Sequence, residues 1–71
     1  MNSFKIDEFV EYKGVLCRIE AYGENYAILE LKSLHSSYIG PIGKLFFAST
    51  DNVRYASPIK LAKYRVQNER M

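Results

Sequence analysis

The sequence has little of what builds a cross-linked or metal-held framework: its 71 residues include one cysteine, one histidine and no tryptophan. A single cysteine cannot form an internal disulfide, and a lone thiol is typical of a reducing compartment. His35 has no second histidine or cysteine at zinc-ligand spacing, so we expect it to be a solvent-exposed loop histidine. These shortages predict a fold held by packing alone, with no metal and no cofactor.

Long apolar runs and an excess of one charge are lacking as well. No run approaches the roughly 20 residues that a helix needs to cross a bilayer, and the first residues form neither a basic leader nor an apolar h-region. We therefore expect a cytoplasmic protein with no membrane partner. The net charge is only +2, but residues 1–30 carry three basic and six acidic side chains, and residues 31–71 carry seven basic and two acidic ones. This asymmetry predicts a basic face on the C-terminal half.

Alternation of apolar and polar residues is the main feature of residues 8–32. Successive side chains of a strand point to opposite faces of a sheet, so this stretch predicts three antiparallel strands joined by two tight turns, the first at Gly14. The strands are expected at residues 9–13, 15–22 and 26–31. Glu11 and Lys13 should face water. The side chains expected to point inward are Val10, Tyr12, Val15, Cys17, Ile19, Ala21, Ala27, Leu29 and Leu31.

The rest of the chain predicts a loop, two more strands and a helix. An irregular loop rich in serine and glycine is expected at residues 33–43, followed by strands at residues 45–48 and 53–56 with a turn or single 3₁₀ turn between them. Ser57 suits a helix N-cap, and Pro58 suits the first helical position. In such a helix one side would carry Ile59, Ala62 and Val66. A strand is the alternative, because alternate positions also share a face: Lys60, Ala62, Tyr64 and Val66. The cap signal favours the helix.

Five short strands with one long loop predict an all-β fold, a small closed or half-closed five-stranded barrel with a short C-terminal helix. The segments that carry a resemblance are Val10-Glu11-Tyr12-Lys13-Gly14, Cys17-Arg18-Ile19, Ala27-Ile28-Leu29-Glu30-Leu31 and Asn52-Val53-Arg54-Tyr55-Ala56-Ser57. They resemble small SH3-like barrel modules of the KOW and Tudor type, of the kind common among small bacteriophage proteins, over about residues 6–57. The resemblance implies a binding module for protein, RNA or DNA. The chain then divides into a lead-in at residues 1–7, an SH3-like barrel at residues 8–57 and a helix or tail at residues 58–71.

No residue pattern predicts catalysis. Cys17 lies in phase with Val15 and Ile19, which indicates a buried thiol and not a nucleophile. Glu20 and Glu30 fall on outward strand positions, where we expect both carboxylates to be solvated, whereas a carboxyl that acts as a general acid is usually buried. We therefore assign no catalytic residue and predict that the chain is not an enzyme.

Two groups of residues could carry binding instead. Apolar residues out of phase with the inward set, together with apolar residues of the long loop, predict a protein-binding surface. These are Tyr22, Tyr26, Ile28, Tyr38, Ile39 and Ile42. Basic residues interleaved with tyrosines suit phosphate contact and base stacking. These are Arg54, Tyr55, Lys60, Lys63, Tyr64 and Arg65, with Arg70 beyond them.

The favoured hypothesis is a non-enzymatic module that binds another protein. The resemblance implies one form of this role, a phage-type modulator or inhibitor of a host or defence machine. The alternative is nucleic-acid or nucleotide binding through the basic C-terminal half. A homo-oligomer fits as well, because domains this small often gain stability by oligomerising.

Overall fold

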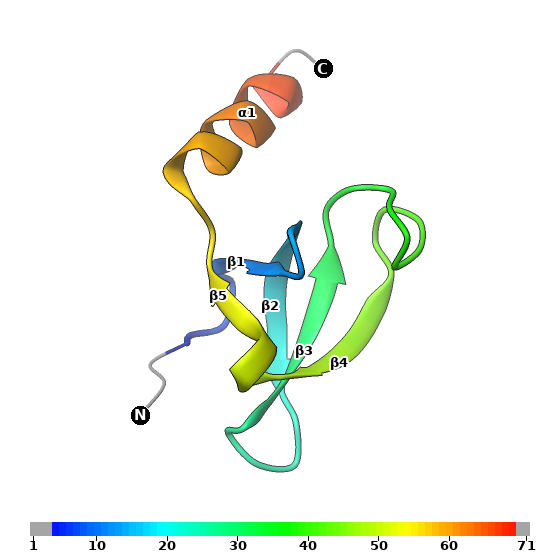
Figure 1. The fold of residues 1–71 in the computed structure, drawn as a ribbon, viewed down its shortest axis with the longest axis vertical. Helices are drawn as coiled ribbons and strands as arrows, with labels where there is room; N and C mark the ends of the chain where they lie inside the picture. The colour runs from blue at the N-terminus through cyan, green and yellow to red at the C-terminus, as the bar shows by residue number, and fades with distance from the viewer. Residues whose placement is uncertain (1–3, 70–71) are drawn as a thin grey trace.

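Figure 1 shows a curled antiparallel sheet followed by one helix at the C-terminal end. The computed structural model describes residues 4–69, so residues 1–3 of the expected lead-in and Arg70 of the expected basic stretch lie outside the described residues. The elements are β1 (Phe9–Tyr12), β2 (Val15–Tyr22), β3 (Ile28–Ser33), β4 (Leu45–Ser49), the 3₁₀ turn η1 (Thr50–Asn52), β5 (Val53–Tyr55) and α1 (Pro58–Glu69). The prediction of five strands and a short C-terminal helix is confirmed.

The strands form one sheet in the order β4-β3-β2-β1-β5, and every neighbouring pair is antiparallel. The pairing of β1 with β5 places the last strand in the sequence beside the first one. Within the described part of the chain no pairing joins β4 to β5, so the sheet is open and these two strands are its edges. Closure into a barrel is therefore not confirmed.

The β1–β2 hairpin forms where the sequence predicts it. Lys13 and Gly14 adopt φ angles of 48° and 86°. A two-residue turn with both φ angles positive matches the right-handed twist of the flanking strands. Lys13 belongs to this turn, so β1 ends one residue earlier than expected.

The third strand begins later than predicted. The Asn25 side-chain oxygen accepts a hydrogen bond from Ala27 N–H at 2.9 Å, and its backbone carbonyl accepts one from Ile28 N–H at 3.2 Å. These bonds hold Tyr26 and Ala27 in a turn, because an asparagine side chain can replace a backbone group in a turn. The predicted strand at residues 26–31 is wrong at its start, and Ala27 is exposed and not inward.

A β-bulge changes the alternation of side chains near the end of β2. Ile19 pairs with Leu31, the register then shifts, and Tyr22 pairs with Leu29. A bulge adds one residue to one strand, so the residues beyond it exchange faces. Tyr22 therefore shares a face with the core residue Leu29. Ala21, which was expected to point inward, lies on the other face and is half-buried.

The core is built mainly from β1, β2 and β3, as the alternation predicts. The buried apolar residues that pack together are Phe4, Val10, Val15, Cys17, Ile19, Leu29, Leu31, Ala48 and Val53. Tyr12, Ile39 and Phe46 are partly buried against this cluster. Phe4 closes one end of the core, whereas Ile6 in the same lead-in is exposed.

The helix α1 begins with the predicted cap. Lys60 N–H donates to Ser57 Oγ at 3.2 Å, and Pro58 is the first helical residue, so the helix is confirmed over the strand. The helix meets the sheet through Tyr64, whose ring centre lies 5.8 Å from that of Phe9. The apolar side therefore faces away from the sheet and is exposed; it carries Ile59, Ala62 and Val66. In the described part of the chain, no helix has the length and apolar character that a membrane span requires.

Candidate protein-binding surface

Four large apolar side chains gather where β2 ends, β3 begins and β4 runs beside them. The sheet-end surface, as we define it, consists of Tyr22, Tyr26, Ile28 and Phe47. An open hollow of about 570 Å³ at this surface is lined by Tyr22, Gly23, Glu24, Ile28 and Phe47. The ring of Tyr26 stands at 75° to that of Tyr22, with 5.0 Å between the ring centres. A concave, mostly apolar site of this size is typical of a binding site.

The backbone fixes the positions of Tyr22 and Ile28. Gly23 N–H donates to the Ile28 carbonyl oxygen at 2.8 Å. A Cβ atom at Gly23 would lie 2.8 Å from Ile28 Cγ2, so this close approach requires glycine. The Tyr22 hydroxyl donates to the Phe4 carbonyl oxygen at 2.8 Å, which ties the surface to the segment before β1. These side chains are therefore held in place before any partner binds.

Phe47 is the member of the sheet-end surface that sequence reasoning missed. Phe46 and Ala48 face the core, so the alternation of β4 sends Leu45 and Phe47 outward, where they are 53% and 65% exposed. The alternation along residues 45–48 could have predicted from the sequence that Phe47 is exposed. The β3–β4 register, which sets Phe47 opposite Glu30, could not be predicted from the sequence.

The candidate residues of the long loop lie elsewhere. Figure 1 shows the β2–β3 and β3–β4 loops at opposite ends of the sheet, so Tyr38, Ile39 and Ile42 do not join the sheet-end surface. Tyr38 and Ile42 are exposed, and the Tyr38 hydroxyl donates to the Lys13 carbonyl oxygen at 3.2 Å. Ile39 is half-buried against the core. The six candidate residues for protein binding thus divide between two separate surfaces.

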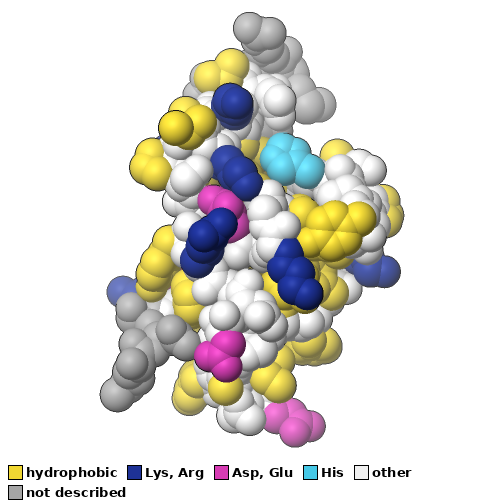
Figure 2. Space-filling model, viewed as in Figure 1, with side chains coloured by type: hydrophobic (Ala, Val, Ile, Leu, Met, Phe, Trp, Pro, Cys, Tyr) yellow, Lys and Arg dark blue, Asp and Glu magenta, His cyan; other side chains and the backbone are white. Residues whose placement is uncertain are grey.

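Figure 2 shows Lys and Arg side chains gathered on one face, from α1 to the middle of the sheet, with an acidic side chain among them. Arg54 and Lys63 are exposed. Arg65 follows Lys63 by two residues, which is about 200° around a helix, so it points to the other side of α1. The six candidate residues for nucleic-acid binding are therefore not on one face, and such a role for them stays a prediction.

The two tyrosines of that set are engaged within the fold. The Tyr55 ring centre lies 4.8 Å from that of Phe4. Tyr64 is half-buried between Phe9 and His35, with ring centres 5.8 Å and 5.9 Å away. The expectation that His35 is a solvent-exposed loop residue is wrong, because this contact with the helix leaves it half-buried.

Glu11 forms an ion pair with Lys60 of the basic set, and the expectation that it faces water is wrong. It is 5% exposed, because α1 covers this side of β1. Its carboxylate accepts hydrogen bonds from Ser57 N–H at 2.8 Å and from Lys60 Nζ at 3.1 Å. The Ser57 N–H holds the pKa of the Glu11 carboxyl below its usual value, and Lys60 adds to this effect while burial opposes it. Lys60 Nζ also donates to the Gly14 carbonyl oxygen at 2.6 Å, so its charge is used to attach the helix.

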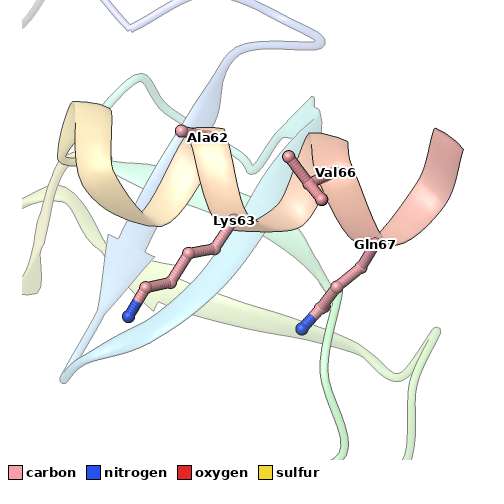
Figure 3. Close-up of a pocket in the computed structure, with 4 residues that line it drawn as sticks. All are labelled: Ala62, Lys63, Val66 and Gln67. Carbon is pink, nitrogen blue, oxygen red and sulfur yellow. The ribbon is translucent and has the colours of Figure 1, made fainter. Parts of the chain in front are cut away.

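Helix α1 carries a hollow of its own. Figure 3 shows the long side chains of Lys63 and Gln67 extending from one side of α1, and the short side chains of Ala62 and Val66 nearer the opposite edge of the helix in this view. These four residues line a hollow of about 330 Å³, and all of them come from the helix itself. Among the described residues, no second element contributes a wall that would enclose a ligand, so this hollow is weaker as a site than the sheet-end surface.

The structure does not pair the carboxylates of Glu20 and Glu30, the two acidic residues considered as catalytic candidates. Glu20 accepts from Arg18 Nε at 2.8 Å, and the β-bulge sets Glu30 opposite Ala21, so the two carboxylates are not cross-strand partners. Among the described residues, no three His, Cys, Asp or Glu side chains lie close enough to hold a metal ion.

Cys17 should resist alkylation while the chain is folded. Its side chain is fully buried, and burial raises the pKa of its thiol to about 11. The reactive thiolate is therefore scarce as well as inaccessible. Mass spectrometry after treatment with iodoacetamide at pH 8 should find no adduct in buffer and full modification in urea. Rapid labelling in buffer would contradict the burial of this thiol.

The fold and its surfaces define a small, mostly antiparallel β domain with one helix. Comparison of the chain with protein-family models, with curated proteins and with solved structures finds no match. A function must therefore be inferred from the residues of the chain itself.

Proposed function

We propose that the chain is a small non-enzymatic binding module that holds a protein partner at the sheet-end surface. The observation that carries this proposal is the hollow beside Ile28 and Phe47, whose apolar walls stay exposed in the folded chain. Aromatic side chains in concave sites supply much of the binding energy at protein interfaces. The curled five-stranded sheet also supports the SH3-like class suggested by the sequence, whose members are mostly binding modules.

The partner suited to this surface presents apolar side chains from an extended segment. Glu24 is the one charged residue among those that line the hollow, so an apolar side chain fits it best. Beside the hollow, β4 is an edge strand. An extended segment can pair with such an edge through its backbone and place alternate side chains on the adjoining surface.

Two observations favour protein over nucleic acid as the partner. The ammonium group of Lys60 is held by Glu11 and by the Gly14 carbonyl oxygen, which leaves less positive charge for phosphate contacts. Tyr64 is packed between two other rings and does not offer a free face for base stacking. A phage-type modulator or inhibitor would be one form of the proposed activity.

A captured partner should be lost on Tyr26→Ser and retained on Tyr38→Ser. Tyr26 is 78% exposed and Tyr38 is 72% exposed, so the same change is compared on the sheet-end surface and on the distant loop. Truncating an anchor at an interface costs about 2 kcal/mol, or roughly 30-fold in affinity. Pull-down of the tagged chain from lysate, with the captured protein quantified by mass spectrometry, measures the difference.

Nuclease treatment and salt separate the two kinds of partner. Capture that survives both, and that depends on Tyr26, supports the proposal. Capture that is unchanged by Tyr26→Ser would contradict it. Recovery of nucleic acid that is removed by high salt and by Lys63→Glu would instead assign the function to the basic face.

A further inference from the structure

The edge of β4 has backbone groups that do not bond to β3. Ser33 N–H donates to the Lys44 carbonyl oxygen at 2.9 Å, and Thr50 N–H donates to the Ala27 carbonyl oxygen at 2.9 Å. These two bonds lie at the two ends of the β3–β4 ladder. Along an antiparallel ladder, residue pairs that are hydrogen-bonded alternate with pairs that are not. The even-numbered residues of β4 therefore bond to β3, and the odd-numbered residues do not.

The odd-numbered residues of β4 are Leu45, Phe47 and Ser49. Their N–H and C=O groups point to the free edge, since β4 ends the sheet in the described part of the chain. The five residues of β4 include no charge and no proline, which are the usual means of keeping an edge strand unpaired. The exposed side chains of Leu45 and Phe47 add apolar area on the same strand. This edge is therefore suited to pairing with another strand.

We propose that this edge pairs with β4 of a second copy of the chain, antiparallel and about a twofold axis at Phe47. This identifies the partner of the sheet-end surface and so rests on the proposed function. In this register Phe47 lies opposite Phe47 of the second copy, and Leu45 lies opposite Ser49 of the second copy. All three odd-numbered residues then face odd-numbered residues, so every outward backbone group gains a partner.

The side chains fit the same register. Two phenylalanine rings meet across the axis, and aromatic cross-strand pairs stabilise antiparallel sheets. Opposite Leu45 stands the small Ser49 of the second copy, and Ile28 of that copy lies beside its Ser49 in the β3–β4 register. Leu45 can therefore reach over the serine to Ile28, at the hollow of the second copy. The hollow of each copy thus receives one apolar side chain of the other copy.

Charge supports the pairing at both ends of the strand. Lys44 comes directly before β4 and Asp51 lies two residues after its end, in η1, so the antiparallel pairing brings Lys44 of each copy to the end of the paired strands where Asp51 of the other copy lies. Lys44 and Asp51 are both exposed. The twofold axis repeats this contact, so two opposite-charge pairs flank the paired strands. A pairing of five residues on each side makes a small interface, which is typical of a reversible dimer.

Two measurements on the wild-type chain test the proposed dimer: its mass in solution and the hydrogen exchange of its backbone amides. Sedimentation equilibrium should show a rise from 8.2 kDa to about twice that mass as the concentration increases. Hydrogen exchange followed by NMR should show protection of the Leu45, Phe47 and Ser49 amides that grows with concentration, to about tenfold. The Phe46 and Ala48 amides bond to β3 and serve as the internal control, with protection that does not depend on concentration.

Phe47→Glu should keep the chain monomeric at every concentration, because it sets two carboxylates opposite each other across the axis. Tyr38→Glu adds the same charge at an exposed site away from β4 and should still dimerise. A wild-type chain that stays at 8.2 kDa, or exchange at Leu45, Phe47 and Ser49 that is independent of concentration, would overturn the second copy as partner. If a monomeric chain still captures a protein in a Tyr26-dependent way, the proposed function stands and only the identity of the partner is wrong.

Discussion

Glu11→Gln should lower the free energy of unfolding by about 2 kcal/mol at pH 7, which is the typical contribution of hydrogen bonds to a charged group. The Glu11 carboxylate is buried under α1 and accepts from Ser57 N–H and Lys60 Nζ. Glutamine keeps the shape of the side chain but removes the charge and one of the two acceptors. Urea denaturation followed by circular dichroism measures the loss.

At acidic pH the wild type and Glu11→Gln should have the same free energy of unfolding. The pKa of the Glu11 carboxyl is lowered from 4.5 in the folded chain. A group whose folded pKa lies below its unfolded pKa stabilises the fold above the unfolded value, and this contribution is lost as the pH falls through the folded pKa. The wild-type advantage should therefore be complete at pH 6 and decrease steadily below about pH 4.5. A difference that stays constant from pH 7 to pH 3 would contradict this role for the Glu11 charge.

Lys60→Met provides the matched control for Glu11→Gln. The Lys60 side chain is 40% exposed, so solvent screens its ion pair with Glu11. Removing the lysine leaves the Ser57 N–H bond to the carboxylate in place. The loss for Lys60→Met should thus be smaller than that for Glu11→Gln. The opposite ranking would show that the ion pair, and not the backbone hydrogen bond, attaches the helix.

Glu11 also shows a limit of the alternation of apolar and polar residues along a strand. The alternation predicts which face of the sheet a side chain lies on more reliably than it predicts whether that side chain is buried. Glu11 and Leu16 are cross-strand partners on the face away from the core, as their positions in the sequence suggest. Both are nevertheless buried, because α1 lies over this side of the hairpin. The cap at Ser57 made the helix predictable, but where the helix would lie depends on contacts between distant residues. No local pattern contains that information.

The same limit applies to the sheet-end surface. Tyr22, Tyr26 and Ile28 are close in sequence, so a hairpin alone brings them near one another. The β-bulge that moves Tyr22 to the core face leaves no sign in the alternation, because it inserts a residue without interrupting the strand. Phe47 joins them through the β3–β4 register, which depends on where the long loop ends. The sequence therefore predicts the local part of the site, and tertiary pairing completes it.

Leu31→Ala should lower the free energy of unfolding by about 3 kcal/mol, whereas Leu45→Ala should change it by less than about 0.5 kcal/mol. Leu31 is 0% exposed in a strand paired on both sides, and its loss leaves a cavity that β2 and β4 cannot close. Leu45 loses the same atoms at the exposed edge. Urea midpoints of the two variants, compared at concentrations where the chain is monomeric, give the two values.

The pair of variants separates stability from binding. A chain of this length has a total stability of about 4–10 kcal/mol, so a loss near 3 kcal/mol should lower the urea midpoint of Leu31→Ala by about a third or more. Leu45→Ala should stay folded but pair more weakly at β4, since Leu45 is the side chain that reaches the hollow of the second copy. If Leu45→Ala destabilised the monomer as much as Leu31→Ala does, Leu45 would belong to the core of a single chain, and its side chain would need no partner to explain it.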